Sequence, residues 1–143
     1  MNSMNHVVKC SGKIIFSPNR PGLKKSHRSF DNGVILKVDN GITEYYSWWL
    51  NRKFGISIAK PAWGTHITIV NDRDRVKDLG AFEVLKKKFN NKIASVGYDV
   101  RLNKQWQFWV LEVLPSPELV EIRKSLGLRE DYPFHITIGR DDV

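Results

Sequence analysis

The sequence predicts one α+β domain built from two similar lobes of antiparallel strands, with helices packed outside and a central cleft between the lobes. The tetrapeptide HITI occurs twice, over residues 66–69 and 135–138. A helical stretch, a glycine and a connection that contains proline precede each copy, so one order of elements is repeated. The chain of 143 residues has the usual size of a single domain. Such a duplication predicts two lobes related by an approximate twofold axis.

The chain is expected to begin with two strands, because residues 7–16 and 33–38 are rich in apolar and β-branched side chains. The stretch between them, about 17–32, contains many turn-forming and basic residues, which predicts a long basic loop. This loop could bind phosphate groups or be only solvated, and both interpretations stay open.

A first helix is expected over residues 41–54. Its aromatic and basic side chains recur at helical spacing: Tyr45, Trp48, Trp49 and Arg52. Asn40 or Thr43 could cap its start. We expect the aromatic rings to face the core, because an amphipathic helix buries its apolar side.

A second helix is expected over residues 78–90. Four apolar residues form its stripe: Leu79, Phe82, Leu85 and Phe89. A third helix is expected to start at Ser116, whose hydroxyl could cap it, with Pro117 in the first turn. Gly127 is expected to end that helix.

A hairpin is expected between the second and third helices. Apolar and polar residues alternate over 94–102, which is typical of a strand with one buried face. Asn103 and Lys104 are expected to form the turn, and the apolar run 105–113 then returns as the second strand.

The charge of the chain favours anionic partners. Twenty-three Lys and Arg residues against fifteen Asp and Glu give a formal charge of +8 and a pI near 9.7. Basic proteins attract nucleotides and nucleic acids, although the same charge could serve solubility alone. We therefore expect a nucleotide or oligonucleotide substrate and infer no obligate protein partner.

One cysteine, Cys10, cannot form an internal disulfide, which favours a reducing compartment. The N-terminus lacks an apolar signal segment, and no apolar run is long enough to cross a bilayer. We expect a cytoplasmic protein that is not bound to a membrane.

The repeated motif places polar groups on one side of a strand. Successive side chains in a strand point to opposite faces, so His66 and Thr68 share a face while the isoleucines point into the core. His135 and Thr137 repeat this arrangement. With twofold-related lobes, all four polar side chains would converge on one cleft.

Two imidazoles and two hydroxyls suit phosphodiester cleavage without a metal ion. One histidine would accept a proton from the attacking oxygen and the other would donate one to the leaving oxygen, in either order. The threonine hydroxyls would bind the non-bridging phosphate oxygens. Arg73 and Arg140, just past the two motifs, are candidates for a cationic rim. We expect no metal and no cofactor, because no carboxylate or thiol stands at ligand spacing beside the histidines.

The paired motif resembles that of the two-histidine (2H) phosphoesterases, which carry two H-x-[TS]-x motifs in a bilobal α+β fold. This family includes 2′-5′ RNA ligase and cyclic phosphodiesterase proteins, and phage members that degrade cyclic oligonucleotide messengers of CBASS immunity. The resemblance covers residues 33–140 and implies that His66, Thr68, His135 and Thr137 form a metal-independent catalytic site. It implies activity on 2′,3′-cyclic phosphates, 2′-5′ linkages or cyclic oligonucleotides.

Aromatic residues near the motifs could stack on a base. Trp63 is the first choice, because it lies in a loop-like segment just before His66. Tyr132 and Phe134 precede His135 in the same way, and the hairpin tryptophans 106 and 109 are further candidates. The alternative function is an RNA- or nucleotide-binding module that recognises phosphate without cleaving it.

Overall fold

A computed structural model describes residues 6–18, 32–59, 64–71 and 74–141. The helices are α1 (Gly41–Phe54), α2 (Leu79–Phe89) and α3 (Pro117–Ser125). The first strands are β1 (Val7–Phe16), β2 (Val34–Lys37), β3 (Ile58–Ala59) and β4 (His66–Val70). The remaining strands are β5 (Ile93–Asp99), β6 (Asn103–Gln105), β7 (Phe108–Glu112) and β8 (His135–Asp141). The expected α+β class is confirmed.

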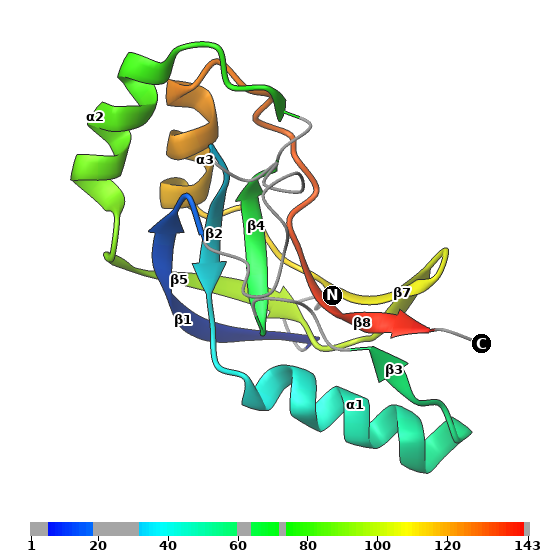
Figure 1. The fold of residues 1–143 in the computed structure, drawn as a ribbon. Coiled ribbons are helices and arrows are strands. Elements are labelled where there is room, and N and C mark those ends of the chain that lie inside the picture. Colours follow the sequence, from blue (N-terminus) through cyan, green and yellow to red (C-terminus); the bar gives the residue numbers. More distant parts are fainter. Residues whose placement is uncertain (1–5, 19–31, 60–63, 72–73, 142–143) are drawn as a thin grey trace.

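In the described residues the strands form one antiparallel sheet in the order β5-β1-β2-β4-β8-β7-β6, and β3 pairs with the free part of β8. The sheet curls so far that Tyr98, in β5, bridges to Val113, just after β7. The two similar lobes stay a prediction: the described strands form one continuous sheet, and the two halves of the chain meet where β4 pairs with β8 (Figure 1).

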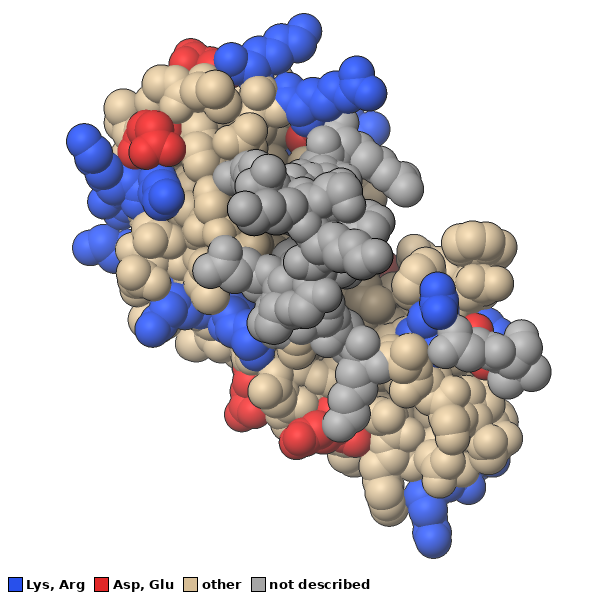
Figure 2. Space-filling view, in the orientation of Figure 1, with Lys and Arg blue, Asp and Glu red and all other residues tan. Residues whose placement is uncertain are grey.

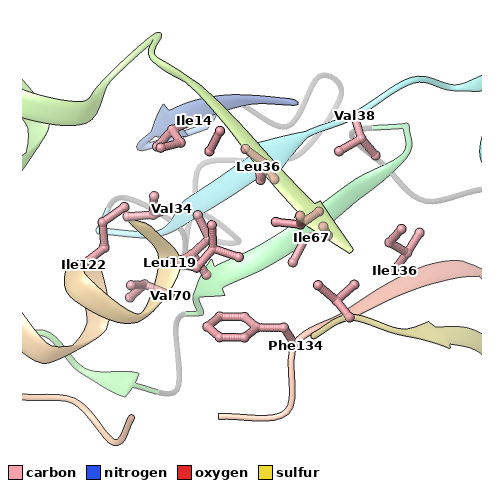
Figure 3. Packing of buried hydrophobic residues seen from close by; sticks show 14 of the residues in the cluster. Ile14, Val34, Leu36, Val38, Ile67, Val70, Leu119, Ile122, Phe134 and Ile136 are labelled. Carbon is pink, nitrogen blue, oxygen red and sulfur yellow. The ribbon is translucent and has the colours of Figure 1, made fainter. Parts of the chain in front are cut away.

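The hydrophobic core lies inside this curl. Isoleucines of both motif strands enter it, with Ile67 and Ile136 both 0% exposed. Helix α3 adds Leu119 and Ile122, which lie beside the ends of β2 and β4 (Figure 3). Helices α2 and α3 lie together at one end of the sheet and α1 lies at the other (Figure 1). Because the motif strands lie between β2 and β7 and bury their isoleucines in this core, they have a close-packed support.

Helix α1 has the predicted bounds, but only some of its aromatic residues turn toward the core. Tyr46 packs against the core and Trp49 is half-buried, whereas Tyr45 is 55% exposed and Trp48 is 58% exposed, so the expectation was wrong for these two. The helix covers only the end of the sheet and buries a narrow side that includes Leu50. The first backbone amide of α1 is bound by a residue that the sequence did not indicate. The carboxylate of Asp39 accepts a hydrogen bond from the Gly41 amide at 2.8 Å.

Two details of the other helices also differ from expectation. The hydroxyl of Ser116 forms no cap hydrogen bond in α3, although Pro117 does occupy the first turn. In contrast to α3, helix α2 does have a side-chain cap: the carboxylate of Asp78 accepts a hydrogen bond from the Ala81 amide at 2.9 Å. Leu79 is 55% exposed, because it stands at the first position of α2, before the buried stripe begins.

The predicted hairpin was wrong in its pairing and in its turn. The strand over Ile93–Asp99 pairs along its length with β1 and meets the predicted returning strand only at the bridge between Tyr98 and Val113. The hairpin joins the short strand β6 to β7, so residues 103 and 104 lie in a strand. The turn is formed by Trp106 and Gln107, with Trp106 at a positive φ of 58°.

Candidate active site

The two motif strands are neighbours at the centre of the sheet. Strands β4 and β8 run antiparallel, with Ile67 directly opposite Ile136. Antiparallel pairing then sets His66 across from Thr137 and Thr68 across from His135. Opposed side chains on one face have Cβ atoms about 4.5–5.5 Å apart. The two histidines and two threonines therefore form a four-residue cluster, which we call the His-Thr cluster.

The His-Thr cluster lies on the face of the sheet that points away from the core. All four of its side chains are half-buried. The isoleucines that alternate with them are fully buried (Figure 3). The predicted alternation of polar and core residues in both motifs is confirmed.

Both imidazoles are oriented by the same local hydrogen bond. The Nδ1 atom of His66 lies 2.9 Å from the carbonyl oxygen of Gly64. The Nδ1 atom of His135 lies 3.0 Å from the carbonyl oxygen of Pro133, again two residues earlier. Since a carbonyl oxygen only accepts, each Nδ1 carries the proton and donates it. The neutral ring then carries its lone pair on Nε2, which is the form that a general base requires.

Each motif is followed by a β-bulge at the same position. Thr68 and Val70 face consecutive residues of β2, so Ile69 is the extra residue. In β8, Thr137 and Gly139 face consecutive residues of β7, so Ile138 is the extra one. A bulge re-aims the residues that follow it. The bulge in β8 turns the exposed Arg140 to the face that carries the His-Thr cluster.

The turn before the first motif is held by residues at the start of α1. The side-chain oxygen of Asn40 accepts from the Thr65 amide at 3.0 Å and from the Lys37 ammonium at 2.8 Å. The hydroxyls of Thr43 and Thr65 also bond to each other. Gly64 packs closely against this group: a Cβ at that position would stand 2.6 Å from the Asn40 side-chain oxygen. Its φ of +72° also favours glycine.

The segment before the second motif is held by a buried arginine of α3. Arg123 is 1% exposed and its guanidinium stacks 4.0 Å from the centre of the Tyr132 ring. It donates to the Asp74 carboxylate at 2.9 Å and to the Ile69 carbonyl at 3.0 Å. The Tyr132 hydroxyl accepts from the Asn71 amide group at 3.0 Å. These bonds tie the end of β4 to the start of β8, where His135 stands.

The neighbours of the His-Thr cluster differ on its two sides. On the β2 side, Lys37 is directly opposite His66. On the β7 side, Glu112 is directly opposite His135. Ile35 and Val110, the adjacent residues on this face of β2 and β7, are 1% and 2% exposed. The cluster thus has an apolar flank in each direction, a cation beside one histidine and a carboxylate beside the other.

A pocket of about 420 Å³ opens beside His135. Its lining includes Glu112 and Gln105 from β7 and β6, and Tyr132, Pro133 and Phe134 from the segment before β8. A volume of this size lies within the range of small-ligand sites. The pocket and the His-Thr cluster therefore share one residue, His135.

The predicted substrate-binding residues lie in different surroundings. Tyr132 is half-buried at the pocket, with one side of its ring under Arg123. Phe134 is 2% exposed and its ring lies in the core (Figure 3), although it also borders the pocket, and its role as a stacking surface stays a prediction. Trp63 and Arg73 lie outside the described residues, as does most of the loop predicted over 17–32.

The hairpin tryptophans also lie away from the His-Thr cluster. Trp109 is opposite Gly139, on the core side of the sheet, and the Lys104 ammonium lies 5.5 Å from its ring centre. Trp106 is 81% exposed at the tip of the turn. Of the two alternatives for Trp109, a place beside the site or a place against the core, the structure has the second.

Sequence reasoning missed three residues around the site: Lys37, Glu112 and Arg123. The first two stand at alternating positions with Ile35 and Val110, and strand periodicity would have placed them on the polar face once pairing was known. Arg123 resembled an ordinary solvent-exposed residue near a helix end, and no sequence signal separates it from Lys124.

The surface of the described residues carries more basic than acidic side chains. Lys and Arg surround much of the visible face, especially near α2 and α3, and acidic groups form smaller patches (Figure 2). Burial raises the pKa of the Cys10 thiol, which makes this cysteine a weaker nucleophile. Among residues 6–18, 32–59, 64–71 and 74–141 there is no group of three potential metal ligands.

Comparisons with known proteins give no relatives for this chain: no family model, no curated protein and no solved structure matches it. None of the helices that the structure describes is long and apolar enough to span a membrane.

Proposed function

We propose that this chain is a metal-independent phosphodiesterase that cleaves nucleotide phosphodiester bonds by two-histidine acid–base catalysis. The observation that carries the proposal is the pairing of Ile67 with Ile136, which brings two imidazoles and two hydroxyls onto neighbouring strands. The repeated Nδ1 hydrogen bonds support it further, because both rings are held in the same tautomer.

The proposed reaction uses each group of the His-Thr cluster once. One Nε2 takes a proton from the attacking oxygen, which is water for a 2′,3′-cyclic phosphate or a ribose 2′-hydroxyl for an internal linkage. That oxygen forms a bond to phosphorus as the bond to the leaving oxygen breaks. The second imidazole, protonated at the start, gives its Nε2 proton to the leaving oxygen.

The remaining groups would stabilise charge on the phosphate. Thr68 and Thr137 stand diagonally across the cluster, so their hydroxyls can donate to the two non-bridging oxygens. Arg140, on the same face, would add a positive charge at the rim. The two halves of the chain, α1 with β4 and α3 with β8, would correspond to the lobes of a 2H phosphoesterase.

The proposal is tested by turnover in the presence of EDTA. The full chain is incubated with 2′,3′-cyclic nucleotides, 2′-5′ oligoadenylate and cyclic di- and trinucleotides, and the products are separated by chromatography. We expect cleavage of at least one of these substrates with the chelator present. The rate should pass through a maximum with pH, since one histidine must be neutral and the other protonated.

Matched variants connect this activity to the site. His66→Ala and His135→Ala should each remove most of the turnover, whereas His6→Ala, at an exposed position, should leave it intact. Binding without any product would favour the alternative, a nucleotide-binding module. Activity that disappears with EDTA would overturn the proposed mechanism.

A further inference from the structure

The pocket beside His135 contains a carboxylate that the proposed chemistry does not use. Glu112 stands directly across from His135 in the sheet and lines the pocket of about 420 Å³. In the part of the chain that the structure describes, Glu112 forms no hydrogen bond or ion pair. The nearby guanidinium of Arg101 is bonded to Asp99 at 2.6 Å instead.

A carboxylate in this place does not suit phosphate, because like charges repel. An ionised carboxylate accepts hydrogen bonds and donates none, so its partner must be a group that carries N–H or O–H donors. Gln105, another polar side chain of the lining, both donates and accepts. Tyr132 and the prolines add apolar surface. This combination is what the edge and faces of a nucleobase require.

The four bases differ in the edge that they would present to Glu112. Guanine carries two adjacent donors, the N1–H and the N2 amino group, which match the two oxygens of one carboxylate. Adenine and cytosine place a single amino group next to an acceptor nitrogen. Uracil places its one N–H between two carbonyl oxygens, which a carboxylate repels.

We propose that this pocket binds the nucleoside next to the scissile phosphate and selects guanine through Glu112. This inference rests on the proposed function, because it takes the His-Thr cluster as the phosphate site. Guanine binds with its N1–H and N2 amino group toward Glu112, the Gln105 amide near its O6, and its phosphate beside His135. The pocket therefore determines which phosphodiester enters the site.

Equilibrium binding of mononucleotides to the full chain tests the selection directly. GMP, IMP, AMP and CMP carry the same phosphate, and IMP lacks only the N2 amino group of GMP. We expect GMP to bind about tenfold more tightly than IMP, since a hydrogen bond to a charged group is lost. AMP and CMP should bind more weakly still.

Two variants locate the effect. Glu112→Gln should bring GMP to within about threefold of AMP, because the bidentate acceptor is lost. Glu83→Gln, which removes the same charge from an exposed position on α2, should keep the full preference. Equal binding of GMP and AMP by the unaltered chain would overturn the inference, as would a preference that survives in Glu112→Gln. Nucleotides that all bind no better than inorganic phosphate would overturn it too.

Turnover separates this inference from the proposed function. Equal cleavage of the 2′,3′-cyclic phosphates of guanosine and adenosine would contradict the selection of guanine and would still support the phosphodiesterase activity. Guanine-selective binding with no product from any substrate would contradict the phosphodiesterase activity and would still support the guanine-binding pocket.

Discussion

The two HITI motifs have the same local geometry but different supports. In both, the histidine Nδ1 donates to the carbonyl two residues earlier and a bulge follows the threonine. The turn before His66 is held by neutral polar groups at the start of α1, where Asn40 is exposed and the bonded hydroxyls of Thr43 and Thr65 are buried. The segment before His135 is held by Arg123, which is almost fully buried. The residues of the His-Thr cluster are therefore alike in the two motifs, and the residues that support them differ.

The largest expected effect is on catalysis, where the two motifs should be equivalent. His66→Ala and His135→Ala should each lower kcat/KM by about 10²–10⁴-fold, which is the usual contribution of a positioned acid or base. The double variant should be little worse than either single one, because the two groups act as a unit. Steady-state kinetics with the best substrate of the panel measures this. A fully active His66→Ala variant would contradict equal roles.

The supports should differ most in stability. Arg123→Ala should lower the free energy of unfolding by about 3–5 kcal/mol, because it removes a buried guanidinium together with its bonds to the half-buried Asp74 and to the Ile69 carbonyl. Asn40→Ala, in the support of the first motif, should cost only about 1 kcal/mol. Urea unfolding followed by tryptophan fluorescence compares the two. Equal costs would show that the two supports do not differ in strength.

Two glycines with nearly the same backbone angle isolate the tight packing of the first motif. Gly64 and Gly55 have φ values of +72° and +69°, but a Cβ at Gly55 meets nothing within 4 Å. Gly55→Ala should cost about 1–2 kcal/mol of stability from the left-handed backbone alone. Gly64→Ala should cost more, because its Cβ meets Asn40, and it should also lower turnover by displacing His66. Thermal melts measure the loss of stability in each variant and kinetics measure its turnover. Equal stability and equal turnover in the two variants would contradict the packing argument.

The smallest expected effect concerns Asp99, at the end of β5, which belongs to neither motif. Hydrogen bonds from Arg101 hold the pKa of the Asp99 carboxyl at about 2, below its ordinary value of 3.8. The pair therefore stabilises the fold above about pH 4, and this stability is lost as the pH falls toward 2. Asp99→Asn should be slightly less stable than the unaltered chain at pH 7, and the difference should shrink in acid. A difference that is constant from pH 7 to pH 3 would contradict this.

Much of the local structure could be predicted from the sequence. The bounds of α1 were predicted because Gly55 ends it in the left-handed region, and those of β1 because its apolar residues are β-branched. Strand alternation predicted that His66 and His135 would lie on polar faces. These features depend on residues that are close in the sequence, so one amino-acid sequence was sufficient to predict them.

Pairing and burial depended on distant residues and could not be predicted. The strand over 93–99 pairs with β1, and nothing in its own pattern distinguishes β1 from β7. Trp48 of α1 is exposed, and the helix lies at the end of the sheet (Figure 1). The bulge that turns Arg140 outward arises from the register with β7, which the sequence of β8 does not encode.

The central claim is that His66 and His135 act on one phosphate. The most direct test follows the imidazole nitrogen resonances of both histidines by NMR while inorganic phosphate is added to the full chain, with His6 as the internal reference. The account predicts that both Nε2 signals shift with the same half-saturation concentration while the His6 signals stay in place. Signals that shift at different concentrations, or a shift of only one of the two rings, would contradict it.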